Sequence, residues 1–203
     1  MPLIRQEGPR LETATSTEDA PVKVGKEKFA VYGMEVEIPA DWRVEFNPKG
    51  TRRKADVVFQ SPHGNRFFVS WGPLADAEKK FKTLEEHRDY GVKRIQKGPD
   101  VRGAEVSDLV ERQIDGHRAL VSHVTAKLQR GMMSRGTSSR EIWSIHFHCP
   151  NTSRYYVVYS MQRESDEFDD LSVIFRELAD SIRCHPEGSI APTSFIGQQT
   201  SYN

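Results

Sequence analysis

Apolar and polar residues alternate along several short segments of the chain, and this period of two predicts β-strands. The clearest case is 34–38, where Met, Val and Ile alternate with two glutamates before Pro39 ends the segment. Segment 155–159 reads Tyr-Tyr-Val-Val-Tyr and is apolar on both faces, which is typical of a central strand covered on both sides. The pattern predicts the other strands at 29–32, 57–59, 67–71, 106–114, 118–128 and 140–149.

The connections between these strands are short, and short connections favour antiparallel pairing. Asp115-Gly116 between two strands predicts a tight hairpin, because a type I′ turn needs positive φ at both central residues. The 61–65 loop, Ser-Pro-His-Gly-Asn, and the 150–153 loop, Pro-Asn-Thr-Ser, consist mostly of residues that favour turns. We therefore expect hairpins rather than crossover connections.

A period near 3.6 residues replaces the alternation in two segments and predicts two helices. The first begins between Asp76 and Thr83 and ends at Gly98-Pro99, and Thr83 with Glu86 has the spacing of a capping box. The second spans 166–183, with acidic residues in its first turn, where the helix dipole favours anions. Its apolar stripe consists of Phe168, Leu171, Phe175, Leu178 and Ile182.

These elements predict an α+β fold with an antiparallel sheet of about six or more strands and two main helices that cover its faces. At 203 residues the chain has room for one domain with a sizeable core. We expect that domain at 21–185. Segments 1–20 and 186–203 are polar and rich in residues that disfavour packing, so we expect disordered tails there.

Composition narrows the classes of function. The 29 basic and 29 acidic residues cancel, so the chain lacks the basic excess of a general nucleic-acid or anionic-membrane binder. No apolar run approaches the roughly 20 residues that span a bilayer, and 1–20 lacks the apolar stretch of a signal peptide. Two cysteines are too few for a secreted disulfide framework. We expect a cytoplasmic protein without membrane association.

Four features of the sequence occur together in one known superfamily. They are Ile38-Pro39-x-x-Trp42, Ile114-Asp115-Gly116-x-x-Ala119, the aromatic strand 155–159 and the helix end Ser181-Ile182-Arg183-Cys184. On these residues the chain resembles the Mog1/PsbP-like superfamily over residues 27 to 185. The resemblance implies an α/β/α sandwich around an antiparallel sheet. Characterised members of that superfamily are binding or assembly factors, so it also implies a non-enzymatic role.

Both cysteines are expected at the same end of the fold. A helix that returns along the last strand brings Cys184 near the 150–153 turn and hence near Cys149. Three interpretations stay open: buried inert thiols, a Cys149–Cys184 disulfide, and a zinc site that adds His185 or His148. Strand alternation places Cys149 on one face, and His146 with His148 on the other. His117 and His123 lie on the neighbouring hairpin.

Two locally basic segments are candidate contact surfaces for a protein partner. One is the edge at 47–56 with Arg52 and Arg53. The other is the loop at 129–139, where Arg130 and Arg135 flank Met132-Met133, an adaptable apolar pair. Neither segment interleaves aromatic residues that would stack on bases, so nucleic acid is the weaker alternative.

The sequence lacks the common catalytic motifs, namely G-x-S-x-G, a Walker loop, G-x-G-x-x-G and H-E-x-x-H. We therefore expect a non-enzymatic protein-interaction or assembly factor, with no catalytic residue, no cofactor and no resident metal. The alternatives are a metal-dependent enzyme or metal-binding protein around His146, His148, Cys149 and Cys184, and an anion or nucleic-acid binder that uses the basic loops.

Overall fold

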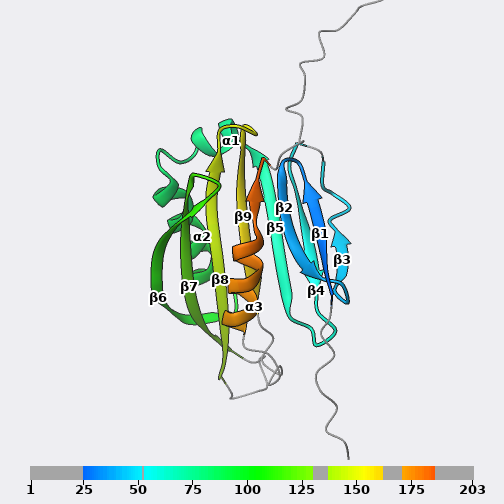
Figure 1. Cartoon of the computed structure of the whole chain (residues 1–203). Helices are drawn as coiled ribbons and strands as arrows, with labels where there is room; N and C mark the ends of the chain where they lie inside the picture. Colours follow the sequence, from blue (N-terminus) through cyan, green and yellow to red (C-terminus); the bar gives the residue numbers. More distant parts are fainter. Residues whose placement is uncertain (1–24, 52, 130–136, 162–170, 186–203) are drawn as a thin grey trace, which may run out of the picture.

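The computed structural model describes residues 25–185 except 52, 130–136 and 162–170 (Figure 1). The expected tails at 1–20 and 186–203 lie outside these residues. A seven-stranded sheet has the order β3-β4-β5-β9-β8-β7-β6, and each of its pairings is antiparallel. Its strands are β3 (Arg43–Phe46), β4 (Ala55–Gln60), β5 (Arg66–Pro73), β6 (Val101–Ile114), β7 (His117–Gln129), β8 (Thr137–Cys149) and β9 (Arg154–Met161).

The strand assignments from alternation are confirmed, although their bounds are wider than expected. Turn chemistry explains the confirmed hairpin: Asp115 and Gly116 have φ of 46° and 81°, the left-handed region that a type I′ turn requires. Strand β6 begins at Val101, ahead of the expected start at 106, because it pairs with the whole length of β7 through two bulges. The antiparallel α+β class is confirmed.

The first two strands do not join the seven-stranded sheet. Strands β1 (Lys26–Val31) and β2 (Met34–Pro39) pair with β10 (Arg183–Cys184) as a separate three-stranded sheet. Strand β2 buries Met34, Val36 and Ile38 and turns its glutamates outward. The alternation predicted the strand and its buried face, but the choice of partner strand depends on contacts with the end of the chain.

Three helices complete the described part of the chain: α1 (Leu74–Glu78), α2 (Leu84–Gln96) and α3 (Leu171–Ser181). Sequence placed one helix start between 76 and 83, whereas the structure has a short helix, an interruption, and then α2. Thr83 caps α2, since its Oγ1 accepts a hydrogen bond from the Glu86 backbone N–H at 3.2 Å. The start of the second predicted helix, 166–170, lies outside the described residues.

Alternation along β8 and β9 sorts side chains onto the two faces of the large sheet. Ile145, Phe147 and Cys149 join the main hydrophobic core, which also contains Phe175 and Leu178 of α3. Helix α2 contacts β6, β7 and β8, and its His87 ring lies against His146. Figure 1 shows α3 in front of the sheet and α2 behind it. No helix in the described part of the chain is long and apolar enough to cross a membrane.

Candidate functional site

Two histidine clusters lie on opposite faces of the end of β8. His146 and His148 face α2, whereas Cys149 is packed in the core on the other face. A metal or catalytic site that combines both histidines with Cys149 and Cys184 is therefore not assembled, because the backbone of the sheet separates the groups. The two faces therefore have to be considered separately as candidate sites.

The α2 face carries a cavity of about 660 Å³ between the helix and the sheet. Its floor is formed by β8 and β9, with Ser144, Tyr155, Val157 and Tyr159 among the lining residues. Its walls come from α2 and from the segment after α1, which contributes Phe81. Cavities that bind organic ligands have volumes of roughly 300–1,000 Å³ and mostly apolar linings with a few polar groups. This cavity fits that description.

His87 and His146 line the cavity, and His148 contacts His87 beside it. His87 Nδ1 is 3.1 Å from His148 Nε2, and the Phe81 ring stacks on His87 with ring centroids 4.6 Å apart. Burial lowers the pKa of His87 to about 4 and that of His146 to about 3, and the positive charge of neighbouring histidines acts in the same direction. All three imidazoles are therefore neutral at pH 7, since the pKa of His148 is also lowered by burial.

Gly91 allows α2 to approach β8 closely at His146. A Cβ atom at Gly91 would lie 2.9 Å from His146 Nε2, so any side chain there must push the helix or the imidazole away. Because His146 is buried, it has little room to move. The glycine thus sets the spacing between helix and sheet next to the cavity.

We expect Gly91→Ala to lower the free energy of unfolding by about 1–2 kcal/mol. The overpacking cost of about 1–3 kcal/mol outweighs the gain of about 1 kcal/mol from replacing glycine in a helix. Urea denaturation measures the change. In a His146→Ala background the imidazole no longer blocks the added methyl group, so Gly91→Ala should stabilise the protein through the higher helix propensity of alanine. Equal destabilisation in both backgrounds would contradict the assigned contact.

The rim of the cavity is basic. Exposed cations line it, namely Lys54, Lys79, Lys80 and Arg94, and the single carboxylate among its described lining residues is Asp76. Asp76 forms an ion pair with Arg53 at 3.2 Å, so its charge is already compensated. The cavity therefore combines an apolar interior with a surplus of positive charge at its mouth, although the chain as a whole is neutral.

The opposite face carries a compact group of four metal-ligating residues: His117, Cys149, Cys184 and His185. Cys149 and Cys184 form a disulfide, with Cα atoms 7.0 Å apart. The Nε2 atoms of the two histidines are 3.1 Å apart, and His117 Nε2 lies 3.5 Å from Cys149 Sγ. The cysteines are buried, and the histidines are partly exposed. Burial and the neighbouring His185 lower the pKa of His117.

Backbone contacts at the end of the chain hold this group together. The Cys184 N–H donates to the Asp115 carboxylate at 2.6 Å, and the His185 N–H donates to the Gly33 carbonyl at 2.6 Å. The β6–β7 turn, the β1–β2 turn and the segment after α3 therefore meet at one point. Sequence reasoning had considered His185 together with the cysteines but had only placed His117 on the neighbouring hairpin with His123.

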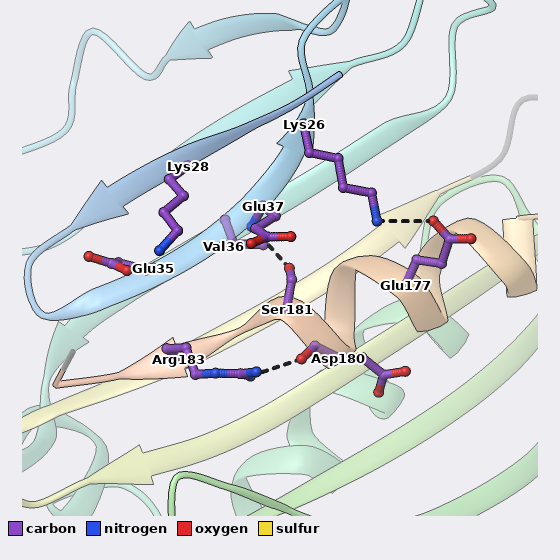
Figure 2. Close-up of a pocket in the computed structure, with 9 residues that line it drawn as sticks. All are labelled: Lys26, Lys28, Glu35, Val36, Glu37, Glu177, Asp180, Ser181 and Arg183. Carbon is purple, nitrogen blue, oxygen red and sulfur yellow. Dashed lines mark hydrogen bonds and ion pairs between the residues drawn. The ribbon is translucent and has the colours of Figure 1, made fainter. Parts of the chain in front are cut away.

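A charged groove of about 480 Å³ runs between β2 and the end of α3 (Figure 2). Its side chains alternate in sign, with Lys26 paired to Glu177 at 3.4 Å and the Arg183 guanidinium bonded to the Asp180 carbonyl. Ser181 Oγ accepts a hydrogen bond from the Glu37 backbone N–H at 2.9 Å. Because cations and carboxylates both line it, this groove lacks the surplus of one charge that marks the cavity beside α2.

Most of the predicted partner-contact residues fall outside the described part of the chain. These are Arg52, Arg130, Met132, Met133 and Arg135. Arg53 is described, and its guanidinium pairs with Asp76 at the rim of the cavity. The 47–56 edge and the cavity are therefore adjacent, which no sequence pattern had indicated.

Sequence reasoning missed His87, Tyr155 and Arg94 as site residues. His87 and Arg94 sit seven residues apart on α2, a spacing of two helical turns that places both on one face, but the same spacing occurs on any surface helix. Tyr155 had been assigned to a central strand with no role. Only the packing of α2 against β8 and β9 reveals that the three residues share a cavity.

Comparison with solved structures shows the fold. The solution structure of cyanobacterial PsbP from Synechocystis sp. PCC 6803 matches 84% of this chain and 98% of its own, with a TM-score of 0.57 and 15% identity. A protein of unknown function from Pseudomonas aeruginosa matches 70% of this chain and 85% of its own, with a TM-score of 0.37 and 12% identity. No family model matches the chain. A search of curated proteins gave no match either. The expected PsbP-like fold is confirmed.

Proposed function

We propose that this chain with a PsbP-like fold is a non-enzymatic protein-interaction or assembly factor, which binds an acidic segment of a partner protein in the cavity beside α2. The observation that carries the proposal is the combination of an apolar interior with a basic rim. A large apolar side chain of the partner would enter the interior, and flanking carboxylates would meet Lys54, Lys79, Lys80 and Arg94.

The surplus of positive charge at the rim favours an acidic partner over nucleic acid. Among the described residues of this chain, no carboxylate forms an ion pair with Lys79 or Arg94 within 4.0 Å. The interior is lined by Phe81, Tyr90, Tyr155 and Tyr159, which would enclose one bulky side chain rather than stack on successive bases. A peptide with a single aromatic anchor between acidic residues fits both properties.

The proposal has three further parts: the arrangement of layers, the cellular location and a second contact surface. We propose an α/β/α sandwich, supported by the contacts of α2 with β6–β8 and of α3 with β2 and β8. We propose a cytoplasmic location, a reducing compartment in which Cys149 and Cys184 would be present as thiols rather than as the disulfide. The loop at 129–139 remains a second proposed contact surface.

A labelled peptide tests the proposed site directly. We expect the peptide Asp-Glu-Trp-Glu-Asp, labelled with fluorescein, to bind the full chain with a saturable rise in fluorescence anisotropy. Replacement of its tryptophan by alanine should weaken binding, because the apolar interior loses its occupant. Arg94→Glu should weaken binding about tenfold, a change of about 1.4 kcal/mol.

Two matched variants separate the cavity from general charge effects. Lys127→Glu reverses an exposed cation on β7 outside the cavity and should leave the affinity unchanged. Ser70→Phe fills the cavity from β5 and should abolish binding. Equal affinity of the wild type and the Ser70→Phe variant would refute the site. Tighter binding of a free aromatic carboxylate than of the peptide would assign the cavity to a small molecule instead.

A further inference from the structure

We propose that His117, Cys149, Cys184 and His185 form a redox-gated zinc site: the disulfide excludes the metal, and its reduction creates a Cys₂His₂ site. The proposal is independent of the α2 cavity, from which the sheet separates it. It departs from the sequence-based expectation of no resident metal. Its basis is that three distant segments of the chain bring four zinc-ligating side chains together.

The donor set is the one that zinc uses in structural sites. Zinc prefers four ligands in a tetrahedron, and two thiolates with two imidazoles are among its usual sets. The four candidate ligand atoms lie within 4.8 Å of one another. The sequence has no C-x-x-C knuckle because the ligands come from β7, β8, β10 and the residue after β10, and His117 and Cys149 are 32 positions apart.

The distances match a tetrahedral ion. With Zn–N of about 2.0–2.1 Å and Zn–S of about 2.3 Å, neighbouring ligand atoms lie about 3.4 Å apart for two nitrogens and about 3.6 Å apart for nitrogen and sulfur. The observed separations are 3.1 Å between the imidazole nitrogens and 3.5 Å between His117 Nε2 and Cys149 Sγ. The two histidines therefore already point at a common position beside the cysteine pair.

The surroundings support the ligands. The Asp115 carboxylate accepts the Cys184 N–H, and the Gly33 carbonyl accepts the His185 N–H, so both residues of the β10 end are fixed through their backbone. The buried cysteines lie on the core side, whereas the partly exposed imidazoles lie on the solvent side. This arrangement gives an ion a path to the site past the histidines.

The chemistry of the switch balances with ordinary cellular reagents. A dithiol reductant transfers two electrons to the disulfide, which yields two thiols and the oxidised reductant. Zn²⁺ then binds the two sulfurs and two neutral imidazoles, and two protons leave the thiols. In the reverse direction hydrogen peroxide takes two electrons from the two thiolates and two protons from solvent, the S–S bond re-forms, two waters are released, and Zn²⁺ dissociates.

Metal titration of the full chain in both redox states tests the proposal. Protein reduced with a phosphine and exchanged into buffer without reductant should bind one Zn²⁺ per chain in competition with a chromophoric chelator, whereas oxidised protein should bind none at this site. Co²⁺ in place of Zn²⁺ should give the intense visible bands of tetrahedral cobalt and a thiolate-to-cobalt charge-transfer band.

Variants assign the signal to the four residues. Cys149→Ala should remove the charge-transfer band contributed by that sulfur, and His185→Gln should weaken metal binding at least tenfold while leaving both thiols. His63→Gln removes an exposed histidine in the β4–β5 turn and should change nothing. The proposal would be overturned by any of three results. These are a reduced wild type that binds no stoichiometric Zn²⁺, a Co²⁺ spectrum that is octahedral, and an oxidised protein that binds Zn²⁺ equally well.

Discussion

Acidification from pH 7 to pH 4.5 is expected to destabilise the protein by several kcal/mol, mainly through the neutral histidines beside α2. Burial lowers the pKa of His146 from 6.5 to about 3, so below pH 6.5 the unfolded chain binds a proton that the folded chain does not. Stability is therefore complete above pH 6.5 and falls as the pH decreases towards the folded pKa. The slope is about 1.4 kcal/mol per pH unit for one such group.

His146 alone should thus contribute up to about 2.7 kcal/mol of the loss at pH 4.5. His87, whose pKa is lowered to about 4, adds to it in the same direction. Urea denaturation at a series of pH values measures the effect. His146→Gln should flatten the dependence by about 2 kcal/mol between pH 6.5 and 4.5, whereas the exposed His63→Gln should not. An unchanged pH profile in His146→Gln would show that another group is responsible.

Reduction of the Cys149–Cys184 disulfide is expected to lower the free energy of unfolding by about 3–4 kcal/mol in the absence of metal. The two residues are 35 positions apart, and a cross-link that closes a loop of this length removes conformational entropy of that size from the unfolded chain. A typical domain has only about 5–15 kcal/mol of stability in total, so this change is large. Urea denaturation with and without a phosphine reductant, in a chelator, measures it.

The double variant Cys149→Ala/Cys184→Ala is the matched control, because it should show the same stability with and without reductant. Thiol titration of the unfolded chain gives the redox state in each sample, with two thiols per chain after reduction and none before it. A wild-type protein whose denaturation midpoint stays constant, although two thiols have been released, would contradict the expectation. Zn²⁺ added to the reduced protein should restore stability if the proposed metal site forms.

Features that depend on residues close in sequence were predicted well. The Thr83 cap and the Asp115-Gly116 turn each need only a few neighbouring residues, and both occur; Glu86, however, accepts from the Lys82 N–H rather than from that of Thr83. The strand of alternating residues before Pro39 was also predicted, and its buried residues are those that the alternation gave. Trp42, which follows it, packs at the edge of the main core, and its backbone N–H bonds to the Pro39 carbonyl.

Features that depend on pairing between distant segments were predicted poorly. Strand β10 is two residues long and carries no pattern of its own, so its pairing with β2 could not be foreseen. Strand β3 was missed because its four residues are mostly exposed and mix charged with apolar side chains. The interruption that separates α1 from α2 was missed because the 76–83 segment fits more than one helix start.

The cavity and the His117–Cys149–Cys184–His185 group illustrate the same limit. Alternation correctly separated His146 from Cys149, since opposite faces of one strand follow from a period of two. It gave no information on which side chains other elements bring to each face. His87 contacts His148 where α2 lies close to β8, next to Gly91. His117 contacts His185 where the chain end is bonded to Asp115 and Gly33.

The sequence by itself therefore determined the α+β class, the positions of the main strands and turns, and the face on which each β8 residue lies. These depend on backbone geometry and on the burial of apolar surface along single segments. The tertiary structure alone decided that β1 and β2 leave the large sheet, that a basic-rimmed cavity lies beside α2, and that four metal-ligating residues meet at the other face. Those features arise from packing between segments that are far apart in the chain. The free energy of that packing cannot be read from the residue pattern of a single segment.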